Sequence, residues 1–142
     1  MNIITKENIQ VNPEIEGSYH TTVNYNGQDI TLAITPDDVA VETTIDLANK
    51  MLSNLDFYEN KARQKIITDF LDTYNESWRD ESQGEAAMDE KTFSTHLNLV
   101  HIWCLSADCF DFYFSENGLF GHHSLIAESF DGENLESSTM FG

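Results

Sequence analysis

Two adjacent histidines, His122 and His123, are the residues whose chemistry is most suggestive in this sequence. Imidazole binds metal ions and transfers protons near neutral pH, and Glu116 and Glu128 supply carboxylates nearby. Adjacent residues of a strand point to opposite faces, so both rings reach one ion only if they lie in a loop. The structural alternative is that His123 is hydrogen-bonded within the fold and His122 is exposed. Because the sequence contains neither H-E-x-x-H nor paired C-x-x-C spacing, we expect no metal site and no cofactor.

Cys104 and Cys109 are the second candidate pair. A catalytic cysteine needs a base, and His101 is the nearest histidine in sequence. On a strand, His101 and Trp103 share one face while Cys104 points to the other. The spacing therefore favours two free structural cysteines over a catalytic pair, with a disulfide across a tight turn as the alternative. We expect no catalytic residue.

The remaining candidates would bind a partner or ligand. Trp78 ends a helical apolar stripe, and the alternatives are that it is buried or that it lines an exposed patch or small cleft with Phe120 and His123. His122 is a further candidate binding residue. A second candidate set consists of carboxylates on the second predicted helix and in the loop after it. These are Asp72, Glu76, Asp80, Glu81 and Glu85.

The net charge limits the class of partner. The 142 residues include 7 Lys and Arg and 25 Asp and Glu, a formal net charge of −18. Residues 1–49 and 92–142 carry −7 each, whereas residues 50–91 carry −4 and hold six of the seven basic residues. The charge therefore belongs to a folded surface and not to an acidic tail. It disfavours direct binding to nucleic acid or an anionic membrane and favours a basic protein partner.

The length and an apolar content of 40% predict a single domain over residues 1–142, with a loosely ordered N-terminal segment at residues 1–13. The N-terminus shows no signal-peptide pattern, and no stretch approaches the roughly 20 apolar residues that span a bilayer. We therefore expect a cytoplasmic protein.

Alternating apolar residues predict the strands. The pattern places them at residues 15–25, 28–35, 98–106, 110–115, 123–130 and 135–140, the first two joined by a type I′ turn at Asn26-Gly27. The long apolar run at residues 98–106 predicts a central strand with both faces at least partly covered.

A helical hairpin is predicted between these strand groups, over residues 37–78. Thr35 and Pro36 suit the N-cap and first position of its first helix, and Asp56 with Glu59 resembles a capping box that starts its second helix. Asp89 suits the N-cap of a further short helix. The order ββ-αα(α)-βββ(β) predicts an α+β fold, with a mostly antiparallel sheet of five to six strands packed against the central helical hairpin.

The chain also resembles the bacterial family designated domain of unknown function 2262, over roughly residues 14–142. The resemblance rests on short motifs: Asn75, Trp78, Phe93, Leu97, Phe112, Phe114, Leu119, Phe120, His123, Ser124 and Gly142. One departure is that the family usually has Phe-Trp-Gly-His where residues 120–123 read Phe-Gly-His-His. The resemblance implies no established activity, but some members look like immunity proteins of bacterial toxin systems.

Together these features predict a non-enzymatic acidic binding protein, with an immunity protein that neutralises a basic toxin as its most concrete form. The alternative is a small ligand-binding or enzymatic domain with a pocket around Trp78, Phe120 and His123. A third hypothesis, a protein that mimics DNA, would need carboxylates spaced regularly along one face.

Overall fold

Residues 3–142, which the computed structural model describes, form one seven-stranded sheet and three α-helices. The strands are β1 (Gln10–Val11), β2 (Tyr19–Tyr25), β3 (Gln28–Thr35), β4 (Asn98–Leu105), β5 (Cys109–Ser115), β6 (Ser124–Ser129) and β7 (Ser137–Phe141). Their order in the sheet is their order in the chain. The helices are α1 (Val41–Leu52), α2 (Leu55–Thr73) and α3 (Glu90–Thr95), with short helices η1 (Lys6–Asn8), η2 (Tyr74–Trp78, a π-helix) and η3 (Glu81–Gln83).

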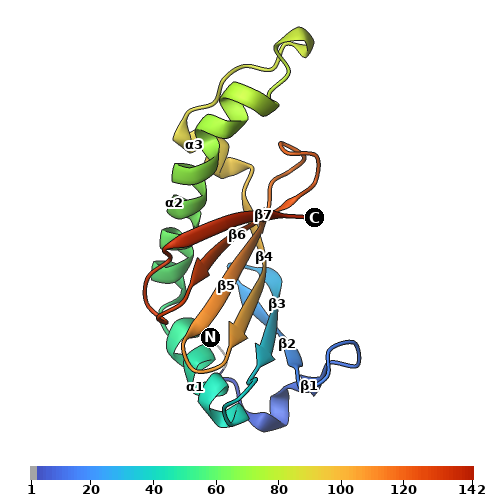
Figure 1. Cartoon of the computed structure of the whole chain (residues 1–142), viewed down its shortest axis with the longest axis vertical. Coiled ribbons are helices and arrows are strands. Elements are labelled where there is room, and N and C mark those ends of the chain that lie inside the picture. The colour runs from blue at the N-terminus through green and yellow to red at the C-terminus, as the bar shows by residue number, and fades with distance from the viewer. Residues whose placement is uncertain (1–2) are drawn as a thin grey trace.

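A single connection between two strands, β3 and β4, contains all three α-helices. All three α-helices lie between β3 and β4, which are parallel, whereas every other neighbouring pair of strands is antiparallel. A parallel pair requires a crossover long enough to return to the starting edge, and the helical segment supplies it. Figure 1 shows the helices on one side of the sheet, with α2 continuing past the end of the strands.

The helix-covered face of the sheet forms the core. Along β3, Ile30, Leu32 and Ile34 are buried, and the three alternating phenylalanines of β5 are buried completely. Because side chains alternate across a strand, the residues between them point to the opposite face. We call that second face, which carries none of the helices, the open face.

The α+β class is confirmed, but the strand number is seven and not five to six. The additional strand is β1, which pairs with β2 through only two residues on each strand. β2 begins at Tyr19 and not at residue 15, because Gly17 adopts φ 78 in a turn closed by Ser18 N–H donating to Ile15 O. An alternating pattern does not distinguish such a turn from the strand that follows it.

Two predicted helix starts were also wrong. α1 begins at Val41 and not at residue 37, because Asp37 adopts φ 59 in a turn where Val39 N–H donates to Pro36 O. The expected capping box at Asp56 is replaced by an N-cap at Asn54. The cap of α3 is confirmed: the Asp89 carboxylate accepts from the Thr92 backbone N–H at 2.8 Å.

The start of the N-terminal segment packs against α1, and β1 pairs with β2. Residues 1 and 2 lie outside the described residues, whereas Ile4 is buried and its backbone exchanges two hydrogen bonds with the Asn49 side chain. The segment forms η1 and β1 and contributes Ile4 to the core.

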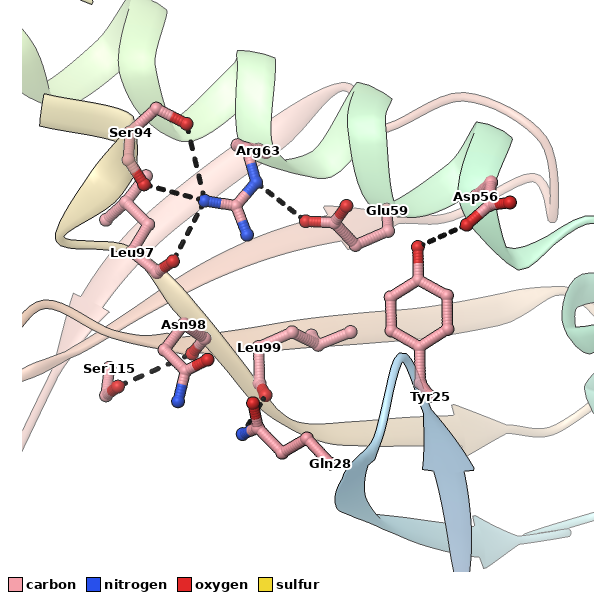
Figure 2. A network of polar contacts seen from close by, with 10 residues as sticks. All are labelled: Tyr25, Gln28, Asp56, Glu59, Arg63, Ser94, Leu97, Asn98, Leu99 and Ser115. Atoms are coloured by element: carbon pink, nitrogen blue, oxygen red, sulfur yellow. Dashed lines mark hydrogen bonds and ion pairs between the residues drawn. The ribbon is translucent and has the colours of Figure 1, made fainter. Parts of the chain in front are cut away.

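Arg63 of α2 connects the helices to the start of β4 (Figure 2). Its guanidinium donates to the carbonyls of Ser94 and Leu97, each at 2.9 Å, and to the Glu59 carboxylate at 2.7 Å. The same group lies over the ring of Phe114, 5.3 Å from its centroid. Arg63 thus satisfies carbonyls at the C-terminal end of α3, where no further helical turn exists to do so.

Replacing Arg63 with Met should lower the free energy of unfolding by about 2 kcal/mol, because two carbonyls lose a charged donor while the aliphatic volume is retained. Urea denaturation followed by circular dichroism would measure the change. The control is Lys65→Met, which removes another cation of α2 from an ion pair with Asp69. That pair is partly exposed, so we expect a loss below about 0.5 kcal/mol. Equal losses in the two variants would contradict the structural role of Arg63.

Candidate functional site

The aromatic residues singled out from the sequence do meet. Phe120 is fully buried, and its ring centroid lies 5.4 Å from that of Trp78, which in turn lies 6.0 Å from that of His123. Phe120 also contacts Phe70, Tyr74 and Phe93. We call these six residues the Phe120 cluster. Trp78 covers the cluster from η2, the π-helix at the end of α2, and 42% of its surface is exposed. Phe120 is therefore a core residue, and Trp78 is a partly exposed residue at the edge of that core.

The loop before β6 is held by its own polar groups. The buried Glu116 carboxylate accepts the backbone N–H groups of Gly118 and Phe120, and a ring nitrogen of His123 contacts the carbonyl of Phe120. His122 is exposed, with φ 67. The two histidines thus have the arrangement of the structural alternative: one is hydrogen-bonded within the fold and the other faces solvent.

A hollow of about 460 Å³ lies beside this loop. His122 and His123 line it together with His96, Glu116 and Asn117, whereas Trp78 and Phe120 do not. Within residues 3–142, no three His, Cys, Asp or Glu side chains are grouped so that they could hold a metal ion.

The cysteines are free and unsuited to act as nucleophiles. Burial raises the pKa of the Cys104 thiol to about 12, and burial with the nearby Asp108 carboxylate raises that of Cys109. Cys104 points into the core while His101 lies on the open face, as the parity of the strand predicted. The thiolate that nucleophilic chemistry needs is therefore disfavoured at both positions.

The predicted acidic set divides into two groups. The carboxylates of Asp80, Glu81 and Glu85 form hydrogen bonds and an ion pair within the loop after η2, where Arg79 is the local cation. Asp72 and Glu76 are exposed on α2 and η2. This end of the molecule lies beyond the sheet (Figure 1).

Two rows of side chains cross the open face, and sequence reasoning did not identify them as a surface. The strand register aligns the first row as Ala33, Trp103, Asp111, Glu128 and Ser137. It aligns the second as Thr31, His101, Tyr113, Ile126 and Thr139. The alternation of β4 and β5 was visible in the sequence, but the pairing of strands that places these residues side by side was not.

Aromatic groups in these rows are held in place by one another and by the sheet. The ring of His101 meets that of Tyr113 edge-on at 5.0 Å, and lies 6.3 Å from that of Trp103. The indole Nε1–H of Trp103 donates to Thr35 Oγ1 at 2.8 Å. All three rings are partly buried, so the open face presents ordered aromatic surface to solvent.

Asp111 and Glu128 are directly opposite one another on β5 and β6. Burial and the Glu128 charge raise the pKa of Asp111 to about 6. Burial lowers the pKa of the neighbouring His101, so this ring supplies no positive charge at neutral pH. None of the five ion pairs among residues 3–142 involves Asp111 or Glu128. Like charges directly opposite in a sheet are destabilising, and here no cation offsets them.

The positive charges of the protein are excluded from the sheet. No strand within residues 3–142 contains Lys or Arg: six of the seven basic residues lie on η1 and the α-helices, and Arg79 follows η2. The open face is therefore acidic and aromatic. The sequence already concentrates six of the seven basic residues in residues 50–91. The fold then places most of that segment in helices, which all lie on the other face of the sheet.

Comparison with known proteins identifies a family whose description names no activity. Residues 8–140 match the model of domain of unknown function 2262, described as an uncharacterized protein conserved in bacteria. The chain belongs to this family. Neither a search of curated proteins nor a search of solved structures found a match. Among residues 3–142, none of the helices combines the length and apolarity that crossing a membrane requires.

The raised pKa of Asp111 predicts a pH-dependent stability. The folded protein holds this proton up to about pH 6, whereas the unfolded chain releases it near its usual value of about 3.9. Stability from this group is therefore greatest below the unfolded pKa and decreases as pH rises through the window between the two values. Asp111→Asn should raise the melting temperature at pH 7.5 relative to wild type, with no gain near pH 4.

Carboxyl carbon NMR would measure the same group directly. The Asp111 signal should titrate near pH 6 in wild type and at lower pH in Glu128→Gln, because that change removes the adjacent negative charge. If the titration midpoint of the Asp111 signal is the same in wild type and in Glu128→Gln, the coupling between the two carboxylates is contradicted.

Proposed function

We propose that this protein is a non-enzymatic binding domain that captures a basic protein. The observation that carries the proposal is the separation of charge: net −18 over the chain, with no Lys or Arg on any strand of the sheet. Such a field speeds the encounter with a cationic partner and repels nucleic acid and anionic membranes. An acidic, partly aromatic surface then offers contact area once the partner arrives.

The residues whose types suggested catalysis have structural contacts or pKa values that do not favour it, which supports a non-enzymatic role. His123 contacts the carbonyl of Phe120, and both thiols have raised pKa values. The Phe120 cluster joins the end of α2, α3 and the loop before β6, which is a packing role.

The most specific form of the proposal is immunity against a bacterial toxin. A nuclease toxin must be cationic where it meets nucleic acid, and an acidic protein can occupy that surface in place of the phosphates. Small size and a high net negative charge suit this role, because association must be fast enough to precede damage in the producing cell.

A second candidate function, small-ligand binding, is favoured by the hollow beside His123. Trp78 contacts His123, so its fluorescence should report a ligand bound there. Trp103 lies on the open face and should report a partner bound to that surface. Trp78→Phe leaves Trp103 as the reporter, and Trp103→Phe leaves Trp78. A basic protein bound to the open face should therefore change the fluorescence of Trp78→Phe, whereas a small ligand in the hollow should change that of Trp103→Phe.

The test of the main proposal begins with the gene adjacent to this one in the source bacterium. If that gene encodes a toxin, expressing it alone should stop growth, and co-expression of this protein should restore it. With both proteins purified, the association rate constant should fall at least 10-fold between about 50 and 500 mM NaCl, since the charges are screened.

Two outcomes would count against the proposal. One is a partner whose association rate is indifferent to salt. The other is an adjacent toxin whose activity this protein does not suppress, together with no measurable binding to that toxin at about 50 mM NaCl.

A further inference from the structure

The centre of the open face combines partly buried carboxylates with partly buried aromatic rings. Trp103, Asp111 and Glu128 are consecutive in one row across β4, β5 and β6, and Tyr113 follows Asp111 by two residues on the same face. Two carboxylates are thus flanked by two aromatic rings on strands in the middle of a continuous sheet. The backbone of β5 is paired on both sides, so the backbone positions that carry these side chains are set by the sheet.

The surroundings of this group contain no internal cation. The groups around Asp111 are Glu128 on β6, Tyr113 and Cys109 on its own strand, and Trp103 and His101 on β4. Burial raises the pKa of Tyr113 and Cys109 and lowers that of His101, so these three are neutral at pH 7. The Ser137 hydroxyl, at 3.2 Å, is the polar neighbour of Glu128 on β7.

We propose that the open face is the docking surface for the basic partner, and that one Lys or Arg side chain of that protein lies between Asp111 and Glu128 against the rings of Trp103 and Tyr113. This inference rests on the proposed function and adds the site. A cation there would remove the repulsion between the two carboxylates, and its aliphatic stem would lie on aromatic surface. The Lys and Arg residues of the chain lie on the helices, on η1 and after η2, so none of them competes with a cation of the partner on this face.

The acidic end of the molecule is a weaker docking surface on the same criteria. Glu81 already pairs with Arg79, and Glu85 accepts the backbone N–H of Asp80. A partner would have to replace these contacts, whereas Asp111 and Glu128 have no cation to displace. Exposed carboxylates also gain less from a cation than partly buried ones, because water screens them.

The direct test titrates N-acetyl-arginine amide into the isotope-labelled protein and follows the two indole N–H signals by NMR. We expect a saturable shift of the Trp103 signal and none of the Trp78 signal. N-acetyl-citrulline amide, which has a similar shape without the charge, should produce neither. Shifts of Trp78 comparable to those of Trp103, or no shift of Trp103 at all, would overturn the proposal.

A matched pair of double variants separates the site from the general field. Asp111→Asn with Glu128→Gln removes two charges from the open face, and Asp72→Asn with Glu76→Gln removes two from the end of the helical hairpin. The first variant should weaken arginine binding at least 10-fold, and the second by less than 2-fold. Equal weakening would mean that net charge alone governs binding and would refute the site. Each Asp→Asn or Glu→Gln substitution nearly conserves the side-chain volume. Near-ultraviolet circular dichroism would verify native packing in both double variants.

The same variants distinguish failure of the site from failure of the function. If wild type binds the basic toxin and the Asp111/Glu128 variant binds it equally well, the docking site is wrong while the proposed function stands. If arginine binds at Trp103 but the toxin does not bind to wild type, the proposed function fails. A loss of toxin binding in the Asp111/Glu128 variant alone supports both.

Discussion

The single crossover between β3 and β4 is the constraint on which the rest of the structure depends. It carries all three α-helices onto one face of a sheet whose strands otherwise follow one another in sequence. That face must then bury the alternating apolar residues of β3, β4 and β5, and the opposite face is left without a covering layer. Since six of the seven basic residues lie on η1 and the helices, the same arrangement removes positive charge from the open face.

The Phe120 cluster shows how family motifs can be structural. Trp78, Phe93, Phe120 and His123 all belong to the pattern that marks the family resemblance, and all of them pack at one junction of α2, α3 and the loop before β6. Phe120 is fully buried there, which is worth about 2–3 kcal/mol of hydrophobic stabilisation. Their spacing reflects packing geometry, whereas the side chains of the proposed docking surface lie on the open face of the sheet.

Several local features followed from the sequence because their causes are local. The turn at Asn26-Gly27 has both residues at positive φ, and Asp89 caps α3 through its own side chain. The start of α1 did not follow, although Thr35 and Pro36 favoured it. Asp37 adopts φ 59 there, and the Thr35 hydroxyl accepts the indole N–H of Trp103, a contact between residues 68 positions apart. Tertiary hydrogen bonds of this kind outweigh the local preference for a helix start.

The sequence by itself determined the α+β class, most of the strands and the large negative charge, because alternation, turn residues and composition are properties of neighbouring positions. The tertiary structure alone decided where that charge lies. Asp111 and Glu128 are 17 residues apart, and Trp103 belongs to a third strand; only the register of β4, β5 and β6 places them in one row. Strand pairing depends on contacts distant in sequence, so the candidate site became visible only when the sheet was assembled.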